Sequence, residues 1–433
     1  MTRRPWVVGN RWDQLDGVEP AVLPRVSVIV AHYDQPAELA RTLHALRAQD
    51  YPRELLEIVV ADDGSPGEVE VPDGVVLVRQ EDRGFRLAAV RNLGVRASSG
   101  EVLCFLDADT APEPGYVRAI TRLPALLPEA LTVGRRRHAD FTGIATDAPV
   151  VDAAAGRELS EPSWLADAYA RSRDLLDADD RSYRFIIGAV MACSRRMFDE
   201  VGGFDESFDT YGGEDWEWAH RMWQAGAVLA HVPEAVAWHD GPEWAERGEA
   251  ARGRANGQTL RLGVSIPVPG SAPRGLRPSA PDLAVRLGGV HDPAALFVTV
   301  DSLLAAFPSA QVVLDGDAAA AFDDPRVSAD ERMPDARVVW EVDRPVVVLE
   351  PQSIAAVVST LGSTETGVVA VHDDEGEALG VLRARRAERR AARWGTTDAF
   401  RTERREIAGI HPVGVAPNVE AWVGGWGDRA HFA

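Results

Sequence analysis

Two aspartates, Asp107 and Asp109, follow the short apolar run 102–106 and stand one residue apart. In an extended segment, side chains two residues apart point the same way, so both carboxylates can converge at a strand end. Two unpaired carboxylates that close repel each other, and a hard divalent cation relieves the repulsion. Such a cation would in turn hold phosphates. Because aspartate is also common in turns, two solvated loop acids are the alternative at this point.

Two other stretches carry residues that could do chemistry. Glu214 and Asp215 follow a pair of glycines and begin a segment with helical spacing. A carboxylate at a helix N-terminus is stabilised and aimed outward, and glycines let a ligand approach the backbone closely. The alternative is a capping acid with a solvated neighbour. His239 ends the apolar run 235–240 and is compatible with either a structural role or metal binding.

The elements that must position these residues alternate along the first part of the chain. Expected strands cover 26–31, 55–61, 75–78 and 102–106, and expected helices cover 37–49 and 87–94. This alternation favours an α/β fold with a parallel sheet, in which ligands bind beyond the carboxyl ends of the strands. Those ends carry His32, Asp62 and Asp107, with polar neighbours, where a nucleotide would sit. A helix is also expected over 164–180.

Composition excludes several classes of function. The 433 residues are 45% hydrophobic, and the net charge of −21 disfavours binding to nucleic acid or anionic lipid. All 46 basic residues are arginine, which excludes a P-loop, Schiff-base or pyridoxal-phosphate lysine. Two cysteines, Cys104 and Cys193, provide neither a disulfide framework nor a thiolate metal site. With no signal peptide or transmembrane run in the sequence, a cytoplasmic location is expected.

Residues 26–110 resemble the nucleotide-binding half of family 2 glycosyltransferases of the GT-A fold, which has a Rossmann-like mixed sheet. The shared pieces are V-S-V-I-V, V-V-A-D-D-G-S, G-F-R-L-A-A-V-R-N and F-L-D-A-D, the last of which is the D-x-D motif. The resemblance implies a nucleotide-diphosphate sugar held through Mn²⁺ or Mg²⁺. The residues that it assigns to the nucleotide sugar are Ala31, Tyr33, Asp62, Asp63, Arg86, Arg91, Asp107, Ala108, Asp109 and Gly213.

Residues 185–239 resemble the acceptor-binding part of a subgroup that contains bacterial chondroitin polymerases, polypeptide N-acetylgalactosaminyltransferases and β-1,4-galactosyltransferases. Their W-G-G-E-D piece appears here as Y-G-G-E-D at 211–215. The resemblance implies that Asp215 is the general base, that Glu214 contacts a sugar, and that His239 joins Asp107 and Asp109 as a metal ligand. One departure is Val190, which stands where the family has an asparagine and leaves the donor sugar open.

The second half of the chain is expected to repeat the first. Pro, Ala, Leu, Thr and Leu of 291–303 recur from 34–46 at a constant offset of 257. The run 368–374 reads as a second D-x-D strand, with Asp374 at the position of Asp107 and Gly376 at that of Asp109. Chance similarity between two α/β segments is the alternative. The expected organisation is a leader (1–24), a GT-A catalytic domain (25–250), a linker (251–280), a smaller degenerate GT-A-like domain (281–395) and a tail (396–433).

The resemblance therefore implies an inverting, metal-dependent hexosyltransferase. Its donor would be a nucleotide-diphosphate sugar, with uridine favoured, and its acceptor a hydroxyl of a glycan or small molecule. A catalytically weak nucleotide-sugar-binding or scaffold protein is the main alternative, and a nucleotidyltransferase is a weaker one, because no glycine-rich triphosphate loop follows the first strand. A homodimer through the second domain is also considered.

Overall fold

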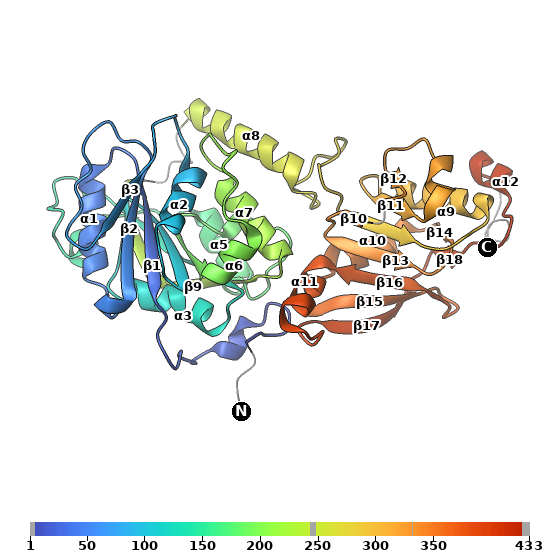
Figure 1. Ribbon diagram of the computed structural model, residues 1–433, viewed down its shortest axis with the longest axis horizontal. Coiled ribbons are helices and arrows are strands. Elements are labelled where there is room, and N and C mark those ends of the chain that lie inside the picture. Colours follow the sequence, from blue (N-terminus) through green and yellow to red (C-terminus); the bar gives the residue numbers. More distant parts are fainter. Residues whose placement is uncertain (1–4, 243–247, 331, 427–433) are drawn as a thin grey trace. The chain divides into compact units, whose positions relative to one another are not determined.

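The structure is a computed structural model that describes residues 5–242, 248–330 and 332–426. The chain divides into two compact units (Figure 1). The first comprises residues 1–223 and 227–262, and the second comprises 224–226 and 263–433. Both have α/β architecture, which confirms the predicted fold class and the presence of a second α/β domain. Among the described residues, no helix is both long enough and apolar enough to span a membrane.

The first unit is built on one mixed sheet, with the strand order β3-β2-β1-β4-β8-β6-β9-β5. Its parallel half contains β1 (Val26–His32), β2 (Leu56–Asp62), β3 (Val76–Arg79) and β4 (Val102–Asp107). The helices α1 (Pro36–Arg47) and α2 (Leu87–Arg96) make the crossovers. The other strands are β5 (Thr110–Pro112), β6 (Ala130–Ala139), β7 (Glu158–Leu159), β8 (Val190–Ser194) and β9 (Val228–Asp240).

The core of this unit lies on both faces of the central strands. All seven residues of β1 are buried, as expected for a strand that is covered on both sides. Helix α2 packs directly on the sheet at Gly94, where an added Cβ would lie 2.5 Å from Ile29 Cγ2. The remaining helices are α3 (Tyr116–Leu126), α4 (Val150–Ala154), α5 (Ser163–Arg171), α6 (Arg195–Val201) and α7 (Glu214–Gln224).

Two expected elements differ from the structure. The helix expected over 164–180 ends at Arg171, because the backbone turns left-handed at Arg173, Asp174 and Leu175, with φ of 51°, 56° and 66°. Tertiary contacts hold this turn: Asp174 Oδ1 lies 2.7 Å from His231 Nδ1 in β9. The segment expected to be a linker is also partly helical, since α8 covers Gly248–Ser265. The boundary between the two units falls within this helix.

The second unit contains a seven-stranded sheet with the order β12-β11-β10-β13-β16-β15-β17 (orange to red in Figure 1). A separate ribbon pairs β14 with β18. The strands are β10 (Leu283–Leu287), β11 (Gln311–Leu314), β12 (Val327–Ser328), β13 (Val338–Val342), β14 (Val346–Val348), β15 (Thr366–His372), β16 (Ala378–Ala384), β17 (Arg401–Glu406) and β18 (Ile410–Pro412). The helices are α9 (Pro293–Ala306), α10 (Pro351–Thr360), α11 (Arg385–Trp394) and α12 (Val419–Gly424).

The second sheet repeats the path of the first from β3 to β9, but it has no counterpart of β5 or β7 within the sheet that the described residues form. In both sheets, the first four strands in the order are parallel to one another. The next two neighbouring pairs are antiparallel, and the pair after them is parallel. β10 and α9 begin 257 residues after β1 and α1. β13, β14 and β15 each begin 236 residues after β4, β5 and β6. The fold of the second unit is therefore a copy of the first, as the offset of 257 predicted.

One part of the predicted alignment is wrong. The counterpart of β4 is β13, so Asp343 and Pro345 stand at the positions of Asp107 and Asp109. Asp374, which was expected to match Asp107, instead follows β15, the counterpart of β6. The error arose because a Gly-Val-Val run is typical of any buried strand. No counterpart of α7 exists in the described stretch 385–406, where α11 ends at residue 394 and β17 begins at 401.

Candidate active site

The carboxyl ends of β1 and β2 are joined through Asp62. Its Oδ1 lies 2.9 Å from His32 Nδ1, and its Oδ2 accepts hydrogen bonds from the N–H groups of Gly64 (3.1 Å) and Ser65 (3.0 Å). Burial alone would raise the pKa of Asp62, but the hydrogen bonds from Ser65 and His32 outweigh it and lower this pKa. Asp62 thus shapes the loop after β2, and a contact to a base would have to replace one of these bonds.

Asp63, its neighbour, closes the next loop. Its Oδ1 accepts from Gln80 Nε2 (2.5 Å) and its Oδ2 from the N–H of Arg86 (2.8 Å), while burial raises its pKa. Three aromatic side chains in this part of the first unit are exposed to solvent. Tyr33 is 47% exposed. Phe85 and Tyr211 are also exposed, and their ring centroids lie 5.5 Å apart. This pair links the loop before α2 to the Y-G-G-E-D stretch.

The D-x-D aspartates face different partners. Asp107 Oδ1 accepts a hydrogen bond from Arg91 Nη2 at 2.9 Å. Asp109 Oδ2 lies 3.4 Å from His239 Nε2 and accepts from Gln35 Nε2 at 3.3 Å. Between them, Ala108 is buried and its N–H donates to the carbonyl of Ala31 at 2.9 Å, which fixes the turn. The structure therefore brings Asp109 and His239 together directly, whereas Asp107, at the end of β4, is bound by Arg91.

Arg91 connects this strand end to the Y-G-G-E-D stretch. Its side chain is almost completely buried; Nη2 donates to Asp107 and Nη1 donates to Glu214 Oε1 at 3.0 Å. Burial would lower the pKa of Arg91, but Asp107 and Glu214 outweigh it and raise this pKa. The guanidinium lies against Gly188, where an added Cβ would be 2.8 Å from Nη1. The glycine at 188 thus leaves room for the bridge.

Glu214 and Asp215 begin α7 and differ in accessibility. Glu214 is buried and its Oε2 has no hydrogen-bond partner, whereas Asp215 is partly exposed. Asp215 Oδ2 accepts from the N–H of Gly188 (2.9 Å) and Oδ1 from the N–H of Trp216 (2.8 Å). Burial raises the pKa of Asp215 against the opposing effect of Arg91. Of the two acids, Asp215 is the one that an acceptor could reach.

Burial, followed by the charge of Asp215, raises the pKa of Glu214 to about 7 from an ordinary value of 4.5. The folded state therefore holds a proton that the unfolded state releases, and this contribution to stability is lost as pH rises from 4.5 to about 7. Glu214→Gln mimics the protonated form. We expect its melting temperature, relative to wild type, to increase over this pH range and then level off. Melting curves from pH 5 to 8 test this, and a pH-independent difference would contradict it.

His239 is oriented as a metal-binding histidine would be. Its Nδ1 lies 3.2 Å from the carbonyl oxygen of Gly241, which favours a proton on Nδ1 and leaves Nε2 facing Asp109. Burial would lower the pKa of His239, but the Asp109 carboxylate outweighs it and raises this pKa. One nitrogen and two carboxylates are a suitable donor set for Mn²⁺. The donor types thus fit the cation that the resemblance implies, but no choice of one ligand atom from each residue brings all three within 4.8 Å of one another, and Asp107 binds Arg91 instead.

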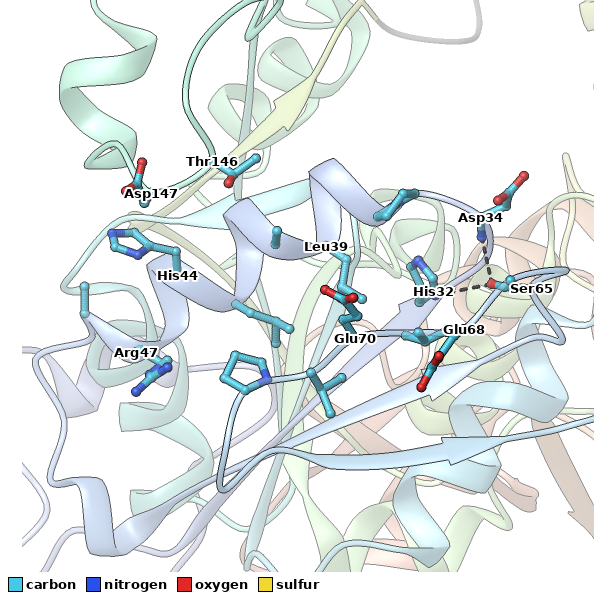
Figure 2. A pocket seen from close by; sticks show the side chains of 18 of the residues that line it. His32, Asp34, Leu39, His44, Arg47, Ser65, Glu68, Glu70, Thr146 and Asp147 are labelled. Atoms are coloured by element: carbon cyan, nitrogen blue, oxygen red, sulfur yellow. Dashed lines mark hydrogen bonds between the residues drawn. The ribbon is translucent and has the colours of Figure 1, made fainter.

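A groove of about 1030 Å³ lies between α1 and the loop 65–72 (Figure 2). His32, Asp34 and Ser65 line one end, and His44 and Arg47 line the other. None of the acidic residues at the ends of β4 and α7 lines this groove. The groove therefore adjoins the nucleotide side of the candidate site but does not contain its reactive groups.

Some features of the site were not foreseen from the sequence. Gln35 donates a hydrogen bond to Asp109. It lies in the loop that follows β1, and a polar residue in that loop could have been predicted as part of the site. Arg91, which the resemblance places near base and phosphates, forms a buried bridge between two acids that was not predicted. Val190 is fully buried at the start of β8, where it pairs with Leu106. Gly213 has φ of 100°, a left-handed conformation that glycine adopts readily and that precedes α7.

The matches to known families coincide with these two halves of the site. Residues 27–143 match glycosyl transferase family 2, and residues 177–237 match the family described as the N-terminal domain of galactosyltransferase. The chain carries a glycosyltransferase family 2 domain. Both resemblances drawn from the motifs are thereby confirmed. The family 2 domain contains Arg91, Asp107 and Asp109, and the second match contains Glu214 and Asp215.

Curated relatives of the family 2 domain include two enzymes of different kinds. Chondroitin synthase of Escherichia coli is 29% identical over 268 residues, which cover 56% of this chain and 38% of that protein. Validoxylamine A glucosyltransferase of Streptomyces hygroscopicus subsp. jinggangensis is 30% identical over 226 residues, which cover 48% and 53%. The matched region is therefore about two fifths to half of each relative.

Among solved structures, GalNAc-T7 with UDP, GalNAc and Mn²⁺ is 20% identical, with a TM-score of 0.42. That match covers 57% of this chain and 48% of the solved one.

Proposed function

We propose that the first unit transfers a sugar from a nucleotide-diphosphate donor to an acceptor hydroxyl, with inversion at the anomeric carbon. The observation that carries this proposal is the buried bridge of Arg91. It joins Asp107 of the D-x-D motif to Glu214, the residue before the candidate base Asp215. Donor-side and acceptor-side motifs that are more than a hundred residues apart in sequence are thereby held in one site.

On the donor side, Asp107, Asp109 and His239 would hold Mn²⁺ or Mg²⁺. When bound, the cation would neutralise the negative charge that develops on the departing diphosphate. His239 and Asp109 already face each other, and Gln35 restrains the Asp109 carboxylate. Arg91 occupies one oxygen of Asp107 and sets the direction of the other. The protein thus supplies two of the ligands already facing each other, and a carboxylate oxygen of Asp107 would complete the set.

On the acceptor side, Asp215 would accept the proton of the attacking hydroxyl. The hydroxyl oxygen would form the new bond to the anomeric carbon from the face opposite the diphosphate, whose bond to that carbon breaks. The N–H groups of Gly188 and Trp216 bind the Asp215 carboxylate and fix its orientation. A general base positioned in this way contributes about 10²–10⁴-fold to rate. Inversion follows from the single displacement.

The relatives support the reaction class more than the donor. Their names include a chondroitin synthase and a validoxylamine A glucosyltransferase, which share the reaction class but not the product or substrate that they name. We favour a uridine diphosphate sugar on the motif resemblance, and either a glycan or a small molecule as the acceptor. A panel of UDP- and GDP-sugars, incubated with the protein, Mn²⁺ and a set of acceptors, tests the proposal. We expect release of one nucleoside diphosphate; none from any donor would overturn it.

Loss of the cation should abolish activity. We expect EDTA, or the pair of changes Asp109→Asn and His239→Ala, to reduce donor turnover by about 100-fold or more, because the charge on the departing diphosphate is no longer neutralised. Nucleoside diphosphate release and Mn²⁺ affinity should fall together. His44→Ala in the groove beside α1 is the control and should keep both. Full turnover in the presence of EDTA would contradict a metal-dependent reaction.

Val190 favours a second candidate, a nucleotide-sugar-binding protein with little transfer activity. The family has an amide at this position, and the buried valine side chain has no group that could bind a sugar hydroxyl. Under this alternative, a nucleotide sugar would stabilise the protein in a thermal-shift assay, but no nucleoside diphosphate would be released.

A further inference from the structure

Three potential ligand side chains converge in the second unit, away from the proposed transferase site. Asp373 and Asp374 directly follow β15, and His411 lies in β18. One carboxylate oxygen from each aspartate and one ring nitrogen of the histidine all lie within 4.8 Å of one another. Among the residues that the structure describes, no other set of three His, Cys, Asp or Glu side chains brings its ligand atoms this close.

The Asp373 carboxylate is buried and only half satisfied. Its Oδ1 accepts hydrogen bonds from the N–H groups of Glu375 (3.0 Å) and Glu377 (2.8 Å). Its Oδ2 is buried with no hydrogen-bond partner. The turn closes through Gly376, whose φ of 84° is left-handed. The loop therefore fixes one oxygen and leaves the other available in a place that water does not reach, which is costly unless another group binds it.

His411 also has an unsatisfied atom. Its side chain is buried, and no hydrogen bond reaches Nδ1. This nitrogen lies 3.3 Å from Asp374 Oδ1, close enough for attraction but without hydrogen-bond geometry. A protonated histidine paired with Asp374 would leave the buried Asp373 Oδ2 unpaired. A shared cation satisfies both Asp373 Oδ2 and His411 Nδ1.

The repeat places this cluster near the position of the first unit's site. Thr110 pairs with His239 in the first unit, and its counterpart Val346 pairs with Pro412 in the second. His411 therefore stands one residue before the position of the predicted metal histidine. In the second unit, prolines stand at the positions of Asp109 and His239. The ring nitrogen of His411 and the carboxylates of Asp373 and Asp374 nevertheless lie together at the same edge of its fold.

We propose that Asp373, Asp374 and His411 bind a divalent first-row transition cation, of which Mn²⁺ and Zn²⁺ are the best candidates. A histidine nitrogen with two carboxylates suits these ions, whereas Mg²⁺ prefers oxygen ligands and retains its water. The ion would join β15 to the β14–β18 ribbon. Because this unit carries Pro345 at the position of Asp109 and has no described counterpart of α7, the site is structural or regulatory and independent of sugar transfer.

The test uses the full-length chain with Asp109→Asn and His239→Ala in place, which removes the candidate cation site of the first unit. Titration with Mn²⁺ and with Zn²⁺, followed by calorimetry and elemental analysis, measures the number of bound ions and their affinity. We expect one ion of either metal per chain. Adding Asp374→Asn and His411→Ala should weaken this binding at least tenfold, as expected for the loss of two ligands.

Asp317→Asn, an exposed change of the same charge in the second unit, is the matched control and should leave binding unchanged. Electron spin-echo spectra of bound Mn²⁺ give an independent measurement, because nitrogen coupling should appear in the background protein and vanish with His411→Ala alone. Melting curves establish that each variant is folded. Absence of binding by both metals in the background, or unchanged affinity in the folded ligand variants, would overturn the proposal.

Discussion

Asp215→Asn is expected to reduce sugar transfer by about 10²–10⁴-fold while leaving the affinity for nucleotide and Mn²⁺ near that of wild type. The amide cannot accept the acceptor's proton at neutral pH. It keeps the size of the carboxylate, and its oxygen can still accept one of the two hydrogen bonds from Gly188 and Trp216. Arg91 binds Asp107 and Glu214 rather than Asp215, so the donor side of the site should be preserved.

Turnover with saturating donor and acceptor, together with calorimetric titration of the nucleoside diphosphate, separates chemistry from binding. Asp199→Asn, on an exposed position of α6, is the matched control and should retain wild-type turnover. Near-normal transfer by Asp215→Asn would show that another group is the base. A parallel loss of nucleotide affinity would instead indicate that Asp215 mainly maintains the structure of the site.

The second large effect concerns stability. Arg91→Met should destabilise the first unit by about 3–5 kcal/mol, because it leaves Asp107 and Glu214 without the cation that they share in a buried place. Arg91→Lys restores the charge but not the two-pronged geometry, so we expect a smaller loss of stability with a marked loss of Mn²⁺ affinity. Urea unfolding, monitored by tryptophan fluorescence, measures the first effect.

Arg96 offers a control from the same helix. Its side chain is largely exposed and lies 3.3 Å from Glu206 in a surface ion pair. Arg96→Met should therefore cost less than about 1 kcal/mol. If the two methionine variants were equally stable, the bridge at Arg91 would contribute no more than a surface pair, and the proposed coupling between the two motifs would be wrong.

The strand and helix pattern made the first half of the fold predictable. β1, β2 and β4 are mainly apolar, interrupted only by Ser27 in β1 and Glu57 in β2, and each ends in the polar residues that the sequence marked as a site. The short helix α5 was not predictable, because the contact between Asp174 and His231 is between residues 57 positions apart in the chain. The helix α8 gave a local signal that was missed: no proline occurs from residue 248 to 265.

The candidate site was predictable in its members but not in their partners. The spacing of Asp107 and Asp109 suggested that they act as a pair. In the structure, however, Arg91 binds Asp107, and His239 faces Asp109. The resemblance assigned Asp62 or Asp63 to the nucleotide, and it did not indicate that two backbone N–H groups, together with Ser65 and His32, bind the oxygens of Asp62. The partners of these carboxylates depend on which hydrogen-bond donors the folded chain brings near them. The local sequence does not specify those donors.

The constant offset of 236 residues from β4–β6 to β13–β15 has a practical consequence. Across this block the two units have kept the same number of residues from the start of one strand to the start of the next, although the lengths of the individual helices, strands and loops differ. Residues 102–136 and 338–372 are thus blocks of equal length with matching strand starts. Grafting the second block onto the first would exchange Asp107 and Asp109 for Asp343 and Pro345 without inserting or deleting a residue, so the chain contains its own length-matched template for engineering.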